Sequence, residues 1–358
     1  MWKDFLAPEQ PSWLLRFIKR VNEHYVSDRG PLLVHCSAGV GRTGTFVAID
    51  SLLEELEKTE EVDIFSCVSS LRKQRNFLVQ SLKQYIFIYR ALLEHAQFGD
   101  TEIEIQHLRD HYLQLKEKLG NSEKTGMVLE FEKLGDVIED PKTCCVGMMD
   151  MNVGKNRYDF IVPYDFNRVI LPVSPSRDHS SYINASFVQT KCQQYWPSDG
   201  ELMCDYVKVK FVSQDVGNHF IRREFDVINV KQQGDSHRTT QLQYLGWVGQ
   251  PVMDADSTAS VLCLVECAQQ GQMQHPNSGP ITVHCSGGGD RSSVFVTLSV
   301  LIQQLKAEER VDVFQAARYT RSQRHCMLQT PNQYEFLYRG LLTYIESHNL
   351  CNMGDTQL

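Results

Sequence analysis

VHCSAGVGRTG at Val34–Gly44 returns in altered form as VHCSGGGDRSS at Val283–Ser293, 249 positions later. In both versions five residues, most of them small, separate a cysteine from an arginine, and apolar runs flank the stretch. A short loop between a strand and a helix can turn successive backbone N–H groups toward an anion, and the helix N-terminus adds partial positive charge. The sequence therefore predicts two strand–loop–helix units that each bind an anion.

The first version carries the residues needed to attack a phosphate ester with sulfur. Pro31–Val34 predicts a buried strand, and the apolar positions of Thr45–Leu56 predict a helix. Cys36 would lie at the base of the loop, where a helix N-terminus and a cation favour the thiolate. Arg42 can bind two phosphate oxygens with its planar guanidinium, whereas Lys cannot. The alternative is that Cys36 is a small buried residue of a structural βα unit.

The stretch His35–Gly44 resembles the phosphate-binding loop of the classical protein-tyrosine phosphatases. The duplication resembles their receptor-type members, which have two tandem cytoplasmic domains. The resemblance implies an α/β fold with a twisted mixed β-sheet flanked by helices. It also implies hydrolysis of phosphotyrosine in proteins through a phosphocysteine intermediate, without a metal or organic cofactor. Cys36 would be the nucleophile, and the phosphoryl group would be held by Ser37, Ala38, Gly39, Val40, Gly41 and Arg42.

Residues on both sides of this loop extend the resemblance. Trp2-Lys3-Asp4 resembles the family's Trp-Pro-Asp loop, with lysine in place of proline, and this makes Asp4 the general acid. Gln80 and Gln84 resemble the glutamines that position the water that hydrolyses the phosphocysteine; glutamine is a neutral donor and acceptor in one group. Taken alone, Asp4 would be a solvated carboxylate and Gln80 a surface residue. Their order and spacing favour the catalytic interpretation.

The second version of the loop departs from this pattern. Cys285 and Arg291 keep their separation, but Asp290 stands where the first version has Gly41. A carboxylate beside a phosphate site repels the ligand. The counterpart of the acid loop reads Trp-Val-Gly at Trp247–Gly249 and so has no acid.

Other parts of the second version resemble the family more closely. Lys155–Tyr158 resembles the phosphotyrosine-recognition loop, in which an aromatic ring stacks on the substrate ring. Phe160 lies where active members usually carry Asp or Asn. We therefore expect a degenerate second site, made of Cys285, Arg291, Asp290, Gln329, Gln333 and Tyr158.

The repeat also suggests a division into domains. Cys36 and Cys285, like Tyr85 and Tyr334, are 249 positions apart, so the two versions align there without a gap. We interpret residues 1–98 as the C-terminal part of a first tyrosine-phosphatase domain, which holds the chemistry but lacks the substrate cleft. Residues 99–122 would be a linker and first helix, with helical spacing over 103–119; residues 123–348 would be the second, degenerate domain and 349–358 a disordered tail.

The central sheet of the second domain is predicted to be incomplete. Tyr182–Val188 resembles the start of the family's central sheet, but Cys192–Pro197 follows almost at once, where the family has several dozen residues. Such a loss opens sheet edges and removes apolar burial. The alternation in Val207–Val212 predicts a strand that could pair with what remains.

Composition limits the partners and the compartment. A net charge of −8 and a pI near 5.9 argue against nucleic-acid binding. The 11 cysteines have neither zinc-site nor disulfide-framework spacing. A thiolate nucleophile needs a reducing compartment, so we expect the cytoplasm, or the cytoplasmic face of a membrane receptor if the parent chain is longer. No stretch reaches the roughly 18 apolar residues of a membrane helix, and the first residues lack a signal-peptide pattern.

Three hypotheses remain open at this stage. The chain is a phosphatase acting on phosphotyrosine-containing proteins, weakened by the missing cleft; or a pseudophosphatase module that binds phosphopeptides or partners; or an incomplete product that folds poorly. Aryl phosphate hydrolysis that Cys36→Ser abolishes separates the first from the others. A cooperative thermal transition separates the second from the third.

Overall fold

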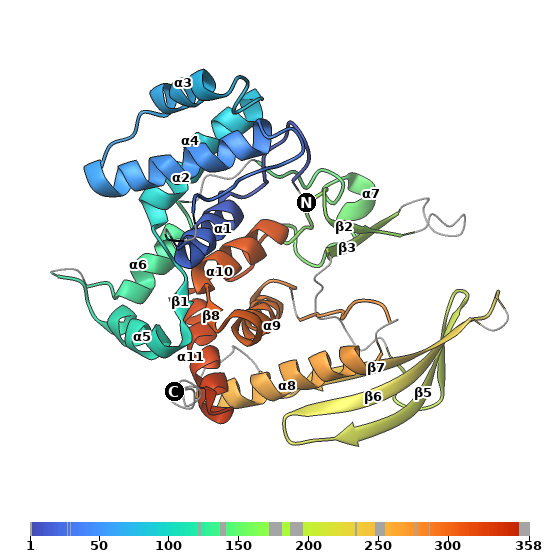
Figure 1. The fold of residues 1–358 in the computed structure, drawn as a ribbon. Coiled ribbons are helices and arrows are strands. Elements are labelled where there is room, and N and C mark those ends of the chain that lie inside the picture. Colours follow the sequence, from blue (N-terminus) through green and yellow to red (C-terminus); the bar gives the residue numbers. More distant parts are fainter. Residues whose placement is uncertain are drawn as a thin grey trace. The chain divides into compact units, whose positions relative to one another are not determined.

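In a computed structural model, the chain folds into two compact units, Met1–Thr101 (unit 1) and Glu102–Leu358 (unit 2) (Figure 1). The structure describes residues 2–26, 28, 30–120, 123–136, 141–171, 181–186, 196–232, 235–247, 255–275, 278–285 and 287–350. Val248, Gly249, Ser286, Phe187, Val188 and residues 192–195 and 351–358, which the expectations above include, lie outside these ranges.

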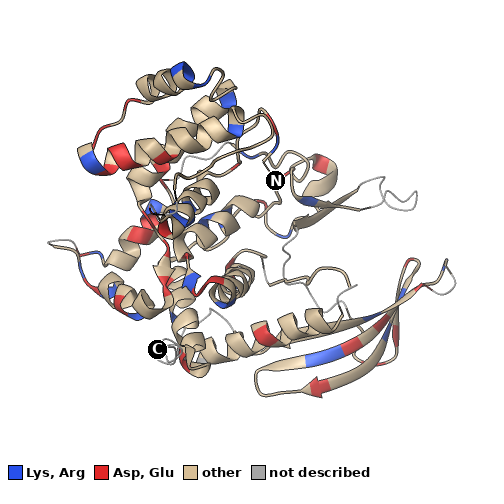
Figure 2. Ribbon diagram, in the orientation of Figure 1, with Lys and Arg blue, Asp and Glu red and all other residues tan. Residues whose placement is uncertain are grey.

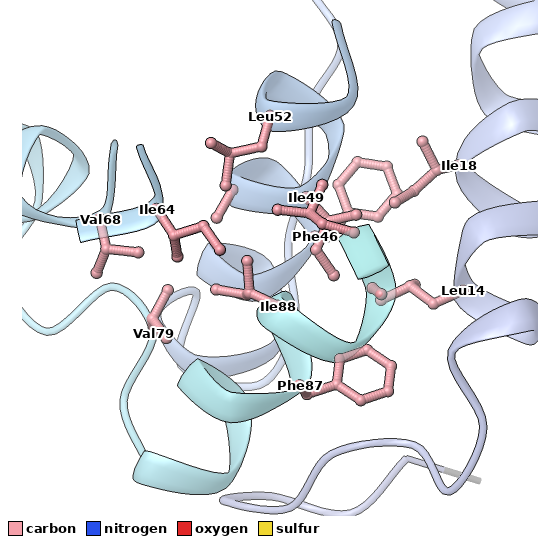
Figure 3. Packing of buried hydrophobic residues seen from close by; sticks show 13 residues of the cluster. Leu14, Ile18, Phe46, Ile49, Leu52, Ile64, Val68, Val79, Phe87 and Ile88 are labelled. Atoms are coloured by element: carbon pink, nitrogen blue, oxygen red, sulfur yellow. The ribbon is translucent and has the colours of Figure 1, made fainter. Parts of the chain in front are cut away.

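Unit 1 is built from helices. They are α1 (Pro11–His24), α2 (Gly41–Thr59), α3 (Ile64–Gln74) and α4 (Leu82–Phe98). Proline at the first turn begins α1, the Asp63 side chain caps α3 by accepting from Ser66 N, and Ser81 caps α4. The apolar faces of the four helices meet in one core, whose labelled members in Figure 3 are Leu14, Ile18, Phe46, Ile49, Leu52, Ile64, Val68, Val79, Phe87 and Ile88.

The strands expected before the two loops do not form, and this part of the prediction is wrong. Residues 31–34 and 281–283 have no regular secondary structure, and Leu33 is 86% exposed. The described part of unit 1 contains no strand, so nothing supplies the hydrogen bonds or the covering that a buried strand needs. The helix predicted over Thr45–Leu56 is confirmed, although α2 begins earlier, at Gly41.

The helices of unit 2 repeat those of unit 1 and add others. They are α5 (Leu108–Lys116), α6 (Gly126–Lys133), α7 (Asp150–Val153), α8 (Ala255–Gln274), α9 (Asp290–Glu308), α10 (Val313–Gln323) and α11 (Pro331–Ser347), with a 3₁₀ turn, η2, at Ile105–His107. The apolar sides of α9 and α11 supply the fully buried Leu298, Leu301, Leu337 and Leu341.

Among the described residues of unit 2, the strands form three antiparallel sheets. Strand β1 (Ile103–Glu104) pairs with β8 (Arg310–Val311), and β2 (Arg168–Ile170) pairs with β3 (Tyr182–Ser186). The third sheet has the order β4 (Glu201–Cys204), β5 (Val207–Val216), β6 (Phe220–Asn229), β7 (Ser236–Tyr244). The α/β class and the strand beginning at Val207 are confirmed. All the described pairs are antiparallel, so any parallel part of the expected mixed sheet is not among them.

The helix predicted over 103–119 is confirmed only for Leu108–Lys116. Its first two residues form β1 instead, because Ile103 is buried opposite Val311 of β8. Positive and negative residues are scattered over the described helices and strands of both units (Figure 2).

Backbone geometry repeats together with the sequence. Left-handed φ angles occur at Phe77 and Cys326 (65° and 64°) and at Val79 and Leu328 (59° and 48°), 249 positions apart in each case. Both α4 and α11 begin with a capping box, closed by Gln84 and Gln333 respectively. The two units therefore share one local architecture around their loops.

Candidate active site

The predicted loop of unit 1 runs directly into the N-terminus of α2. Residues 37–40 form consecutive bends, and Val40 is the N-cap of the helix. Gly39 adopts a φ of +68°, which favours glycine, and a Cβ there would lie 3.3 Å from Arg75 Nη2. That nitrogen donates to Ala38 O over 3.2 Å. The Arg75 guanidinium therefore packs against the turn and fixes its shape.

The half-buried Cys36 is disposed to be a thiolate. Burial opposes its ionisation, but the nearby Thr43 hydroxyl and the backbone N–H groups of Thr43, Gly39 and Val40, which favour the negatively charged sulfur, outweigh this and lower the pKa of Cys36 to about 6. These donors belong to the loop and to the first turn of α2. Thr43 was not predicted as a site residue, although its position one residue after Arg42 was the available signal.

The loop is locked to the segment that carries Gln80. Val40 O accepts from Gly44 N over 3.0 Å and from Val79 N over 3.2 Å. A Cβ on Gly44 would lie 2.4 Å from Val79 N, so only glycine permits this approach. The glycine of the Arg-Thr-Gly motif is thus explained by contact between α2 and residues 78–79.

The two predicted glutamines lie beside the loop. A Cβ on Gly41 would lie 3.0 Å from Gln84 Nε2 and 3.2 Å from Gln80 Oε1, so both side chains point at this glycine. Gln84 is fully buried, and its Oε1 accepts from Gln80 N over 3.0 Å. Gln80 itself is exposed. One amide is therefore fixed in the interior while the other is open to water.

Arg42 joins the loop to the predicted general acid. Its Nη1 donates to Trp2 O over 2.9 Å, and its Nη2 donates to the Asp4 carboxylate. The Asp4 side chain is 60% exposed and the Arg42 side chain 26% exposed, so the pair lies at the surface of the site. A phosphate bound in the loop would compete with Asp4 for the same guanidinium.

The acid loop is tied back onto α4. Leu6 O accepts from Trp2 Nε1 over 2.6 Å and from Gln84 Nε2 over 3.3 Å, and Phe5 O accepts from Ser81 Oγ over 2.8 Å. The Trp2 ring lies 6.3 Å from that of Phe87. Gln84 therefore contacts both the phosphate loop and the acid loop, and Asp4, Arg42, Gln80 and Gln84 lie around the loop that follows Cys36.

The second loop differs in its glutamine. Gln333, the counterpart of Gln84, donates from Nε2 to Asp290 Oδ1 over 3.2 Å. Asp290 and Arg291 begin α9, and Cys285 is only 6% exposed, whereas Cys36 is half-buried. The Asp290 carboxylate thus binds Gln333. In unit 1 the corresponding side chain, Gln84, instead contacts the acid loop at Leu6 O.

Tyr158 lies beside this second loop. A Cβ on Gly287 would lie 3.6 Å from Tyr158 Cε2 and 2.8 Å from Ile161 Cδ1. Phe160 is 64% exposed, with its ring 5.9 Å from that of Tyr158. The predicted recognition loop therefore faces the degenerate site. The Ile161 side chain lies so close to Gly287 that it leaves no room for a Cβ there.

A buried arginine behind the second loop was not predicted. Arg324 is fully buried and donates to Ser186 Oγ over 2.8 Å and to Asn184 Oδ1 over 3.0 Å. Burial lowers the pKa of its guanidinium. It lines a cavity of about 310 Å³ with the predicted Gln329 and with Tyr164, Arg321, His325, Cys326 and Met327. Arg324 is the counterpart of Arg75, but it donates to side chains of β3, whereas Arg75 donates to the backbone of the first loop.

Comparison with known proteins places the chain in a family. A family model described as protein-tyrosine phosphatase matches residues 1–94, 152–191 and 188–343. Tyrosine-protein phosphatase 69D of Drosophila melanogaster is 41% identical over 98% of this chain and 27% of its own length. Human receptor-type tyrosine-protein phosphatase alpha is 34% identical over 97% of this chain and 48% of its own length.

The fold and the duplicated loop are those of a cysteine-based phosphatase. The chain belongs to the protein-tyrosine phosphatase family. It spans about a quarter to a half of the length of these two relatives. In the part of the chain that the structure describes, no helix is both long and apolar enough to cross a membrane.

Proposed function

We propose that unit 1 hydrolyses phosphotyrosine in proteins, with Cys36 as nucleophile. The observation that carries the proposal is geometric: Arg42, in the loop that follows Cys36, contacts the Asp4 carboxylate. The lowering of the pKa of Cys36 to about 6 supports it. Near neutral pH such a thiol is largely ionised, and it attacks phosphorus while Arg42 holds the equatorial oxygens. Sulfur binds phosphorus, and the bond from phosphorus to the tyrosyl oxygen breaks.

Asp4 gives its proton to that departing oxygen. The substrate phosphate displaces the Asp4 carboxylate from Arg42, and the released carboxylate takes up a proton from solvent, which it then gives to the leaving oxygen. A water placed by Gln80 then attacks phosphorus, the phosphorus–sulfur bond breaks, and Asp4 takes up the proton of the water. Gln84 is a positioning residue, since its buried amide holds Gln80 N and Leu6 O.

Unit 2 is proposed to be a degenerate domain that binds rather than hydrolyses. The Asp290 carboxylate accepts a hydrogen bond from Gln333, while Tyr158 still faces Gly287. This favours a phosphopeptide- or partner-binding role as the second candidate function. In this proposal residues 1–98 are the C-terminal part of a catalytic domain, 99–122 a linker and first helix, and 123–348 the degenerate domain, on the cytoplasmic side of a receptor.

Turnover of para-nitrophenyl phosphate by the full chain tests the assignment. We expect Cys36→Ser to abolish hydrolysis, and Cys285→Ser, the matched variant in unit 2, to leave it nearly unchanged. Acid quenching should trap labelled phosphate on Cys36. Equal loss in both variants, with both still showing the thermal transition of the parent, would refute the assignment.

A further inference from the structure

Arg72, in the last turn of α3, reaches forward to the turn that carries Gln80. Its Nε donates to Leu78 O over 2.9 Å, and its Nη2 donates to Val79 O over 2.7 Å. Both bonds are partly buried, so water competes with them weakly. The planar guanidinium therefore joins two consecutive carbonyl groups, a geometry that the point charge of a lysine does not reproduce.

The two carbonyls belong to the peptide groups on either side of Val79. A peptide group is planar, so its C=O and its N–H turn together. The N–H that shares a plane with Leu78 O is that of Val79, which donates to Val40 O over 3.2 Å. The N–H that shares a plane with Val79 O is that of Gln80, which donates to Gln84 Oε1 over 3.0 Å. Each peptide group is thus held at both ends, and the guanidinium supplies one end of each.

These contacts maintain a backbone conformation that is unfavourable for Val79 itself. Val79 is fully buried and has a φ of 59°, in the left-handed region that a β-branched residue avoids. The Gln80 side chain points at Gly41, where a Cβ would lie 3.2 Å from its Oε1. Rotation of the peptide group between Val79 and Gln80 would turn that side chain away from the phosphate loop.

Unit 2 repeats one half of this arrangement. Arg321, the counterpart of Arg72, donates from Nε over 3.2 Å and from Nη2 over 2.7 Å, and both bonds go to Leu328 O. Gln329 N donates to Gln333 Oε1 over 2.8 Å. In both units, therefore, an arginine holds the peptide group that leads into the exposed glutamine.

We propose that Arg72 is a positioning residue for the second half of the reaction, in which water attacks the phosphocysteine. It fixes the peptide group in front of Gln80 and thereby the side-chain amide that directs the water. The loop after Cys36 is instead supported by Arg75, so attack on the substrate should not depend on Arg72. The inference rests on the proposed function of unit 1.

Kinetics of the full chain on para-nitrophenyl phosphate separate this role from a purely structural one. The good leaving group makes attack fast, so hydrolysis of the phosphocysteine limits turnover. Arg72→Gln should lower kcat and KM together, each by about tenfold, the scale on which a charged hydrogen bond acts. It should leave kcat/KM within about twofold, because this ratio reports only the steps up to cleavage of the substrate. Labelled phosphate trapped on Cys36 by acid should increase. Lys73→Gln, at the next and exposed residue of α3, is the control and should change neither constant.

Residue-resolved hydrogen exchange provides a measurement that needs no turnover. In Arg72→Gln the Gln80 N–H should exchange about tenfold faster than in the parent, with the N–H of the buried Ile88 of α4 as reference for global unfolding. The Val79 N–H should change less, because its acceptor is backbone next to α2, whereas the acceptor of Gln80 N is a side-chain amide. Arg72→Lys, which keeps the charge but not the planar fork, should lie between the parent and Arg72→Gln.

Three outcomes would overturn the inference. They are a lower kcat with unchanged KM in Arg72→Gln, as expected if fewer molecules are folded; kinetic constants equal to those of the parent; and Gln80 N–H exchange that the substitution does not alter. If the parent shows no hydrolysis that Cys36→Ser abolishes, the proposed function fails instead. The exchange of Gln80 N–H then decides by itself whether Arg72 holds this turn.

Discussion

Gln333 Nε2 donates to Asp290 Oδ1, whereas Gln84 Nε2, at the corresponding position of unit 1, donates to Leu6 O. The equivalent glutamine therefore donates to the acid loop in unit 1 and to a carboxylate in unit 2. Replacing one glycine by aspartate both adds negative charge to the loop and removes a contact with the segment expected to supply the acid. The two effects can be separated experimentally.

Asp290→Gly should strengthen vanadate binding at the second loop by about tenfold, because it removes like charge next to an oxyanion. Isothermal titration in an Arg42→Ala background, where the first loop is disabled, measures this affinity. Asp290→Asn is the matched control: it removes the charge but keeps an acceptor for Gln333. If neither variant changes the affinity in a folded protein, the cause of weak binding lies outside the loop.

The reactivity of Cys36 toward iodoacetamide should rise with a midpoint near pH 6, where its pKa lies. The thiolate form is stabilised by folding, so this contribution is complete above the pKa of an unfolded thiol, about 8.5, and is lost as the pH falls through 6. Thr43→Ala should raise the midpoint, because it removes a donor to sulfur. Thr43→Ser, which keeps the hydroxyl, should not; a midpoint shared by all three proteins would contradict the role of Thr43.

Asp4→Ala should lower kcat by about 10² to 10⁴ on a tyrosyl substrate, the range for a positioned general acid. It should also lower KM, because Arg42 then has no carboxylate to exchange for phosphate. Initial-rate kinetics of the full chain resolve the two effects. Lys3→Ala, at the adjacent residue, is the control, and a decrease in kcat no larger than its own would remove Asp4 from the mechanism.

Gly44→Ala should destabilise unit 1 by about 1–3 kcal/mol, the usual cost of overpacking. The added methyl would lie 2.4 Å from Val79 N, and backbone cannot yield as a side chain can. Gly271→Ala in α8, where a Cβ meets nothing within 4 Å, should instead stabilise slightly. Thermal unfolding of both variants checks this, and equal transition temperatures would contradict the contact.

Glu130 should make the stability of unit 2 depend on pH. Burial opposes its ionisation, but hydrogen bonds from His111, Tyr334 and Tyr338 outweigh this and lower the pKa of the carboxyl. Its contribution is therefore present above the unfolded value, about 4.3, and is lost as the pH falls through the lower folded value. The difference in unfolding free energy between the parent chain and Glu130→Gln should shrink between pH 6 and pH 3.

Urea unfolding at several pH values measures that difference. Glu132→Gln, on the same helix but paired with Lys124 at the surface, should show almost no difference at any pH. A constant difference for Glu130→Gln would mean that its hydrogen bonds do not depend on ionisation.

The sequence predicted those features that follow from local chemistry. The small residues of the loop and the apolar positions of Thr45–Leu56 identified the turn and α2, because both act within a few residues. The strand expected at Pro31–Val34 depended on neighbours that a local pattern cannot supply. The pairing of Ile103 with Val311, and the contact of Gln333 with Asp290, join distant segments and left no trace in spacing.

The left-handed backbone of Val79 has a mechanical consequence. A β-branched residue in this conformation stores strain of about 1–3 kcal/mol, and here it is held by the bond from its own N–H to Val40 O. Val79 therefore links, in a strained conformation, the turn that follows Cys36 to Gln80, the residue that would direct water. If the hydrogen bond from Val79 N to Val40 O breaks, the turn that binds phosphate and the position of Gln80 are lost together. Formation and hydrolysis of the phosphocysteine should therefore be lost at the same temperature on heating.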